Sequence, residues 1–170
     1  MSSPTYTAFI KLGRLVTRDV LYEVDSLPVG AEFYQRGALK LMPGAPVLVD
    51  HDDDRPIGFA RELCEFPDTD GEWLAALTTI TAPPGWLKRG TAASIGYASL
   101  YRQPLGDAER VLRGLATEVS VLSPGRRPAQ PRAQVALFRR STDEAAPGGQ
   151  VFYGGEMIRR PAIGTIIGIR

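Results

Sequence analysis

Residues 47–60 read VLVDHDDDRPIGFA and contain His51, the only histidine of the chain. The apolar run 47–49 predicts a short strand that leads into a cluster of acids. Pro56 and Gly58 predict a turn, and a second strand is expected to begin at Phe59. Short strands joined by turns are typical of a protein built on a β-sheet.

His51 is placed where the first of these strands ends, among carboxylates that favour the protonated imidazole. A histidine in this setting is a candidate for proton transfer. The alternative interpretation is a solvated acidic turn in which the histidine has no role. Residues 47–60 leave both interpretations open, and the evidence that bears on them lies at Ser94 and Glu118.

The composition limits the classes of protein that the chain can represent. With 170 residues, 44% of them hydrophobic and 23% charged, it is expected to form one globular domain. A net charge of +1 gives no general attraction to nucleic acid or to an anionic membrane. Cys64 is the single cysteine, which excludes an internal disulfide, disfavours a zinc site and indicates a reducing, cytosolic setting. Residues 1–15 (MSSPTYTAFIKLGRL) lack the apolar core of a signal peptide, and the sequence has no run of about 18 apolar residues, so neither a signal peptide nor a membrane span is expected.

The 18 glycines and 14 prolines are spread along the whole chain and favour a sheet or a barrel over a helical bundle. Short helices are expected over residues 33–41 and from Pro83 to Arg89. A polar, Gly- and Pro-containing loop is expected over residues 141–150. The predicted strands cover residues 6–12, 15–24, 47–49, 59–66, 73–80, 91–101, 117–122 and 133–139.

Two further segments resemble the histidine segment, because each sets one reactive side chain on a predicted strand beside a glycine or a turn. Ser94 lies among small residues in 92–97 (AASIGY), where the backbone is open to a substrate. Glu118 lies near the start of the predicted strand 117–122 and precedes the apolar-rich run 119–122 (VSVL). Taken singly, Ser94 could be a packing serine and Glu118 a solvated residue at a strand edge.

Together the three segments resemble the capsid-maturation serine proteases, namely the herpesvirus assemblins and the prohead proteases of tailed phages. In assemblins the histidine lies in an Asn-His-Asp-Asp segment followed by Val-Gly, and here residues 50–53 read DHDD and residues 57–58 read IG. In prohead proteases the nucleophile lies in a Ser-Ile-Gly-aromatic segment, which resembles residues 94–97, SIGY.

The third segment carries the most specific likeness. Residues 118–121 (EVSV) and 123–124 (SP) are similar to the family's third strand. In the herpesvirus proteins Gly-Arg-Arg begins seven residues after the third triad member, as residues 125–127 do after Glu118. The three segments follow in the family's order, with separations of 43 and 24 residues. The resemblance covers roughly residues 9–139, and the last 30 residues match no part of it.

The resemblance implies a catalytic triad of Ser94, His51 and Glu118. A serine hydroxyl needs a base within hydrogen-bond reach, and His51 is the only imidazole available. Glu118 would bind the other ring nitrogen and stabilise the imidazolium. The acids at 52–54 are rivals for this role, but a residue adjacent to His51 in a strand points to the opposite face, and the other two are expected in the turn.

The resemblance also implies an oxyanion site made by the backbone N–H of Arg126 and by the Arg127 side chain acting through a water. Without the family, residues 125–128 (GRRP) could equally be a solvated basic turn. No metal and no cofactor is expected.

The expected fold is α+β: a closed or partly closed, mainly antiparallel β-barrel flanked by a few short helices. The protease domain is expected over residues 1–140, a mobile loop over 141–150, and a C-terminal segment without an assigned role, packed on the same domain, over 151–170. Self-cleavage is expected in the 141–150 loop, whose composition suits nicking.

The implied function is that of a serine endopeptidase of prohead maturation. It would cut the scaffolding segment of the major capsid protein, or a scaffold protein, inside the immature prohead in the host cytoplasm. Family analogy suggests a homodimer, and neither nucleic acid nor membrane is expected as a partner. The alternative function is a non-catalytic capsid-assembly module with the same barrel. A serine hydrolase of another class is disfavoured because residues 92–96 (AASIG) lack the first glycine of a Gly-x-Ser-x-Gly turn.

Overall fold

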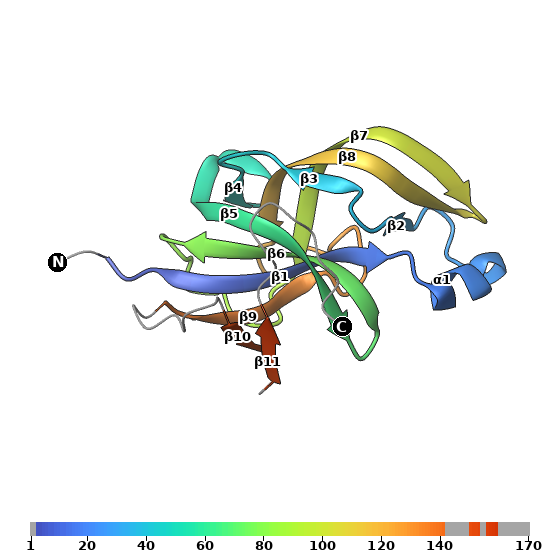
Figure 1. The fold of residues 1–170 in the computed structure, drawn as a ribbon. Coiled ribbons are helices and arrows are strands. Elements are labelled where there is room, and N and C mark those ends of the chain that lie inside the picture. Colours follow the sequence, from blue (N-terminus) through green and yellow to red (C-terminus); the bar gives the residue numbers. More distant parts are fainter. Residues whose placement is uncertain (1–2, 142–149, 154–155, 160–170) are drawn as a thin grey trace.

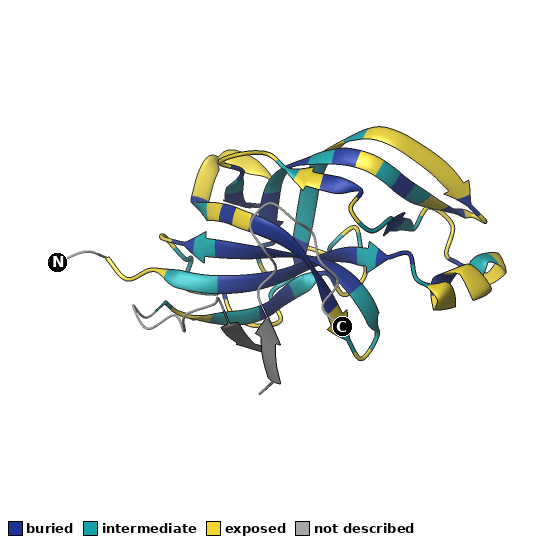
Figure 2. Ribbon diagram, viewed as in Figure 1, coloured by how far each residue is buried: buried dark blue, intermediate teal, exposed yellow. Residues whose placement is uncertain are grey.

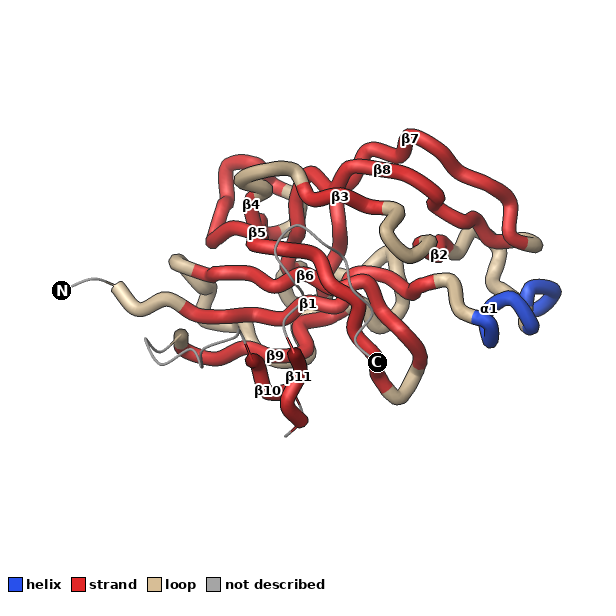
Figure 3. The backbone as a smooth tube through the Cα atoms, viewed as in Figure 1, coloured by secondary structure: helices blue, strands red, loops and turns tan. Residues whose placement is uncertain are grey.

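The computed structural model describes residues 3–141, 150–153 and 156–159, and this part of the chain is almost entirely β-structure (Figures 1 and 3). Its helical segments are short: α1 (Arg18–Tyr22) and a 3-10 turn (Val24–Ser26). The strands are β1 (Tyr6–Leu15), β2 (Glu32–Tyr34), β3 (Leu39–Leu41), β4 (Pro46–Val49), β5 (Asp52–Asp68), β6 (Gly71–Ile80), β7 (Ala93–Leu105), β8 (Ala108–Val121), β9 (Gln134–Arg140), β10 (Gln150–Tyr153) and β11 (Glu156–Arg159).

Nine of these strands form one mixed sheet. The order is β2-β1-β6-β5-β4-β8-β3, with β7 paired to β8 and β9 paired to β1. The long neighbours β1, β5, β6, β7 and β9 pair antiparallel, whereas β2, β3 and β4 all run parallel to β8. In Figure 1 the long β7–β8 hairpin lies above the layer made by β1, β6 and β9.

The predicted α+β class, with a mainly antiparallel barrel flanked by short helices, is therefore wrong. The described part of the chain is mostly β-structure, and its mixed sheet does not close into a barrel. The short strand β2 contacts β1 over two residue pairs and β8 over three. The parallel strands could not be foreseen, because parallel pairing joins segments that are far apart in the sequence.

The two predicted helices are also wrong. Residues 33–41 form β2, a turn at Gly37 with φ of 74°, and β3, and both strands pair with β8. In place of the helix predicted from Pro83 to Arg89, the chain makes a single turn in which Leu87 N–H donates a hydrogen bond to Pro84 O at 3.0 Å. Gly90 N–H then donates to Val135 O in β9. Backbone donors that are used across strands are not available for a helix.

The predicted strand over residues 15–24 is wrong beyond its first residue. β1 ends at Leu15, and Thr17 then caps α1, its hydroxyl accepting from Val20 N–H at 3.3 Å. The strands predicted over 47–49, 59–66, 73–80, 117–122 and 133–139 are confirmed by β4, β5, β6, β8 and β9.

The main core cluster takes buried residues from β8 and its neighbours, and Figure 2 colours buried residues dark blue along these strands. Val119 and Val121 of β8 are fully buried there, and Ala93 and Val47 from β7 and β4 pack in the same cluster. Because side chains alternate along a strand, Glu118 and Ser120 must lie on the opposite face of β8. This alternation fixes the face on which the candidate site is built.

Most of the predicted mobile loop, and with it the expected self-cleavage, lies outside the described residues, as does much of the 151–170 segment. Within that segment β10 and β11 pair with each other in a two-stranded antiparallel sheet. In the part of the chain that is described, no helix has the length and hydropathy needed to span a bilayer.

Candidate active site

His51 lies in a two-residue hairpin turn between β4 and β5. Val49 pairs with Asp52, and the two residues between them, Asp50 and His51, have φ of 54° and 59°. Positive φ at both central residues is the geometry of a type I′ turn, and Asn, Asp and His enter this region more readily than most residues. The expected turn at Pro56 and Gly58 is wrong, since both residues lie within β5.

The turn is anchored to β8 through its backbone. Asp50 N–H donates to Val121 O at 3.0 Å, and His51 N–H donates to the Ser120 hydroxyl at 3.0 Å. Parallel pairing of β4 with β8 places the turn at this point, because Val49 lies opposite Val121. The position of the histidine is thus set by a strand about 70 residues away in sequence.

Glu118 is the partner of the imidazole. Nδ1 of His51 is hydrogen-bonded to Oε1 of Glu118, and Oε2 of the same carboxylate accepts from the Ser120 hydroxyl at 2.7 Å. In the described residues none of the acids at 52–54 forms a hydrogen bond or ion pair with the ring; they belong to β5 and are exposed. His51 keeps 44% of its side chain exposed, whereas Glu118 keeps 13%. A half-exposed ring over a largely buried carboxylate is open to a substrate on its other side.

Ser120 was not singled out by the sequence analysis, although it is central to this arrangement. Its side chain is fully buried. Its hydroxyl donates to Glu118 and accepts from the His51 backbone, so both hydrogen-bonding capacities are used. The available signal was its spacing, since a residue two positions after Glu118 in a strand shares its face.

Ser94 lies in β7, directly across the antiparallel ladder from Ser120, and Gly96 lies across from Glu118. Directly opposed residues point to the same face of a sheet, so Ser94 shares a face with Ser120 and Glu118. Within the described part, no hydrogen bond joins the Ser94 hydroxyl to His51, and Nε2 of His51 has no hydrogen-bond partner. The structure thus brings the three predicted residues to one face of the sheet. The hydrogen bond between the Ser94 hydroxyl and the His51 imidazole is not formed in it.

Gly96 explains how Glu118 reaches the imidazole. A Cβ at position 96 would lie 2.3 Å from Oε1 of Glu118 and 2.8 Å from its Cδ. Side chains cannot approach so closely, and both of these atoms belong to the carboxylate that binds His51. The glycine of the SIGY segment therefore leaves the space that the Glu118 carboxylate occupies.

The predicted oxyanion donors are arranged differently from the expectation. Arg126 N–H donates to Ser123 O at 3.1 Å and closes a turn in which Gly125 has φ of 90°. Nε of Arg126 lies 3.6 Å from Oδ1 of Asp50. Arg127 is exposed. The roles of Arg126 and Arg127 stay predictions, and the Arg126 N–H would have to leave Ser123 to serve an oxyanion.

Asp50 joins this turn to the histidine turn. Its Oδ1 accepts from Ser123 N–H at 2.8 Å, and its Oδ2 accepts from the Ser123 hydroxyl at 2.7 Å. Burial alone would raise the pKa of Asp50, but the Ser123 bonds and the guanidinium groups of Arg126 and Arg55 lower it below the usual range. The carboxylate is therefore ionised at neutral pH and holds both turns in place.

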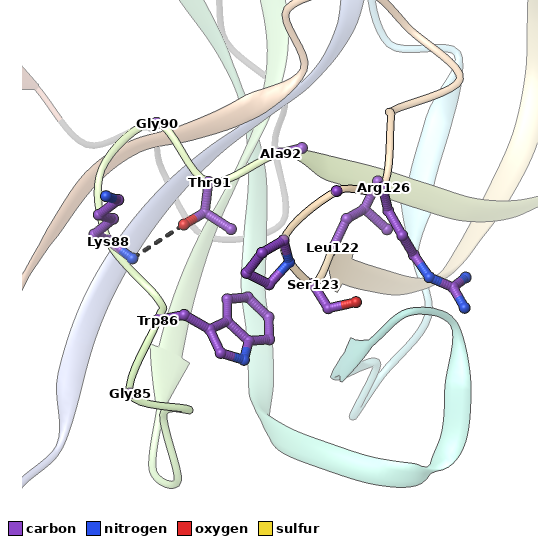
Figure 4. Close-up of a pocket in the computed structure, with 11 residues that line it drawn as sticks. Gly85, Trp86, Lys88, Gly90, Thr91, Ala92, Leu122, Ser123 and Arg126 are labelled. Carbon is purple, nitrogen blue, oxygen red and sulfur yellow. Dashed lines mark hydrogen bonds between the residues drawn. The ribbon is translucent and has the colours of Figure 1, made fainter.

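A pocket of about 420 Å³ adjoins the site. It lies between residues 85–92 and 122–126. It begins where the pairing of β7 with β8 ends, at the hydrogen bond that Leu122 N–H donates to Ala92 O at 2.8 Å. Figure 4 shows the Trp86 indole facing the Ser123 side, while the Lys88 and Arg126 side chains extend away from the indole. Ala92 is two residues from Ser94, so the pocket flanks the candidate nucleophile. Its lining combines the apolar side chains of Trp86 and Leu122 with the charged side chains of Lys88 and Arg126.

No known protein-family model matches the sequence, and no curated protein is significantly similar to it.

Proposed function

We propose that the protein is a serine endopeptidase with Ser94 as nucleophile, His51 as general base and Glu118 as the group that orients the imidazole. One observation carries this proposal: Glu118 binds Nδ1 of His51 through one oxygen, and Ser120 holds its other oxygen. The only histidine of the sequence is thus oriented by a carboxylate on the face that also bears Ser94. A histidine, its orienting carboxylate and a serine are the parts of a nucleophilic triad.

The hydrogen bond to Glu118 determines which ring nitrogen can act as the base. With the Nδ1 proton donated to the carboxylate, the lone pair of a neutral imidazole is on Nε2. Nε2 would take the Ser94 proton as Oγ bonds to the scissile carbonyl carbon. The imidazolium would then protonate the leaving amine as the C–N bond breaks, and water would hydrolyse the acyl-enzyme with the same base.

This reaction requires Ser94 Oγ and Nε2 of His51 to meet when substrate binds. The exposed side of the imidazole allows such a movement, and catalytic hydrogen bonds often tighten only in the substrate complex. Glu118 keeps its place during the movement because Ser120 binds its other oxygen. The proposed role of Arg126 likewise requires its N–H to exchange Ser123 O for the oxyanion.

The substrate in this proposal is an extended peptide. The pocket beside Ser94 presents Trp86 and Leu122 and suits an apolar side chain next to the scissile bond. The resemblance to the capsid-maturation proteases supplies the source of the peptide: the scaffolding segment of a major capsid protein or a scaffold protein. The site of action would then be the immature prohead in the host cytoplasm.

Active-site labelling tests the chemistry without knowledge of the substrate. The full chain is treated with a fluorophosphonate reagent, which phosphonylates activated serines, and its intact mass is measured. We expect one adduct on the wild type, none on Ser94→Ala and a strongly slowed reaction on His51→Ala. Ser99→Ala is the matched control, because Ser99 lies on the same strand and its hydroxyl is buried without a partner in the described part. An adduct that persists in Ser94→Ala would exclude Ser94 as the nucleophile.

Co-expression with the capsid and scaffold proteins encoded beside this chain tests the substrate. We expect trimming of one of them with the wild type and with Ser99→Ala, and none with Ser94→Ala. If the wild type is not labelled and its partners stay whole while a shell assembles, the non-catalytic assembly module is the better assignment. If the wild type is labelled by the fluorophosphonate but trims none of the co-expressed proteins, the assignment as a serine hydrolase stands. The capsid and scaffold proteins are then excluded as its substrates.

A further inference from the structure

A second pocket, of about 680 Å³, is lined by four arginines and two acids. The charged residues that line it are Arg14, Arg18, Arg36, Arg110, Asp19 and Glu72, and we refer to it as the arginine pocket. Arg110 and Glu118 are eight residues apart on β8, roughly 25 Å at the rise of a strand. The arginine pocket is therefore separate from the candidate active site, and nothing argued for it depends on the proposed peptidase activity.

Arg14 is the first arginine without a carboxylate partner. It lies near the end of β1, with its guanidinium 5.8 Å from the centre of the Phe33 ring. Its Nε is buried and has no hydrogen-bond partner among the described residues. A Cβ at Gly71 would lie 2.7 Å from Arg14 Nη2, so the absence of a side chain at 71 makes room for this guanidinium. A buried donor without a partner is costly unless a ligand or water satisfies it.

Arg110 is oriented by a neutral group. Its Nε donates to Gln35 Oε1 at 2.9 Å, and its Nη2 donates to the same oxygen. The amide fixes the direction of the guanidinium but leaves its charge uncompensated. Arg36 differs, because its two terminal nitrogens are paired with Glu65 and Glu72. Within the described part no ion pair is formed by Arg14, Arg18 or Arg110. The positive charges of these three arginines are therefore available to an anionic ligand.

The rest of the lining limits the kind of anion that fits. Val16 and Leu21 supply apolar surface, and Leu21 is 46% exposed. Asp19 and Glu72 would repel a long polyanion, and the chain as a whole carries a net charge of only +1. Arginine binds carboxylates with two parallel hydrogen bonds, which suits side chains of Asp and Glu. These features favour a short peptide that carries both acidic and apolar residues.

We propose that the arginine pocket binds an acidic peptide segment, with Arg14 and Arg110 engaging two of its carboxylates and Leu21 contacting an apolar side chain between them. The volume is within the range of pockets that hold a peptide fragment or a small ligand. The binding is ionic in origin, so it should weaken as the salt concentration rises.

The test is a fluorescence-anisotropy titration of the full chain against a fluorescein-labelled octapeptide of alternating glutamate and leucine. We expect saturable binding at 50 mM salt, and no binding of the same peptide with glutamine in place of glutamate. Arg14→Gln and Arg110→Gln should each weaken binding about tenfold or more, as expected for loss of a charge-assisted contact. Arg113→Gln is the control, since Arg113 is an exposed arginine of β8 outside the pocket.

Three outcomes would overturn the proposal. The first is the absence of saturable binding by the wild type. The second is equal weakening by Arg113→Gln, which would show attraction to general surface charge. The third is tighter binding of a twenty-base oligothymidine or of inorganic phosphate, either of which would assign the pocket to phosphate groups. Thermal unfolding of each variant is measured in parallel, so that loss of binding can be told from loss of the fold. Arg18→Gln changes an exposed arginine of the pocket, on α1, and leaves the core intact.

Discussion

Asp50 accepts two hydrogen bonds from Ser123, one from its backbone N–H and one from its hydroxyl, and so links the turn that contains His51 to the turn that ends at Arg126. The two residues are 73 positions apart in the sequence. The link holds the turn that carries the proposed base next to the turn that carries the proposed oxyanion segment. Asp50 is therefore a positioning residue of the candidate site.

Replacing Asp50 tests this link. Asp50→Ala removes both acceptors and leaves Ser123 N–H without its partner, so we expect a loss of about 2–3 kcal/mol in the free energy of unfolding. Asp50→Asn can keep both hydrogen bonds and tolerates positive φ, so its loss should be about 1 kcal/mol or less. Urea unfolding measures both, with Asp53→Asn, an exposed acid of β5, as the control. Equal losses for Asp50→Ala and Asp53→Asn would contradict the link.

The lowered pKa of Asp50 predicts a pH dependence of stability. Its folded-state pKa lies below the ordinary value of 3.8, so the unfolded chain binds the proton more readily than the folded chain. The stabilisation is then fully present above about pH 4 and is lost as the pH falls toward the folded-state pKa. We expect the difference in unfolding free energy between wild type and Asp50→Asn to be constant from pH 7 to pH 5 and to shrink at pH 3. A difference that grows toward pH 3 would refute this assignment.

Gly96→Ala tests the space that Glu118 occupies. The added methyl group would lie 2.3 Å from Oε1 of Glu118 and should displace the carboxylate from His51. Misplacing a catalytic group by about 1 Å can cost about a hundredfold in rate, and we expect a fall of this size in the rate of fluorophosphonate labelling. Ser99→Ala is the control, because Ser99 lies on the same strand as Gly96 and outside the pocket that flanks Ser94. Equal labelling rates for the two variants would show that Glu118 does not need this space.

Ser120→Ala tests the buried hydroxyl that joins Glu118 to the histidine turn. The change leaves the His51 N–H and one Glu118 oxygen without their partner, so we expect a loss of about 1–3 kcal/mol in unfolding free energy. We also expect slower labelling of Ser94 and an altered pH profile of the labelling rate, because Glu118 is no longer held. Ser99→Ala serves as the control. A stability loss without any change in the pH profile would reduce Ser120 to a structural role.

Several features of the fold could be predicted from the sequence because they depend on local pattern. Apolar runs bounded by Gly and Pro indicated β4, β6 and β9 with nearly correct bounds, but only the last part of β8. The helix prediction for residues 33–41 failed because both halves of that segment find a partner in β8, and tertiary pairing outweighs local propensity. The hairpin turn was misplaced because Pro56 and Gly58 are strong turn formers, whereas Asp50 and His51 form the turn only with anchorage from β8.

The sequence by itself determined which residues are available for catalysis: a single histidine, a serine among small residues and a glutamate that enters a strand, in a fixed order. The arginine pocket is seen only in the tertiary structure. The resemblance already pointed to Glu118 as the partner of His51, whereas the contact between them, the buried hydroxyl of Ser120 and the link between Asp50 and Ser123 were decided by the tertiary structure. The physical reason is the parallel pairing of β4 with β8, which sets side chains about 70 residues apart within hydrogen-bond distance. Spacing along the chain carries no information on such pairing, because the register is fixed only when the strands pack.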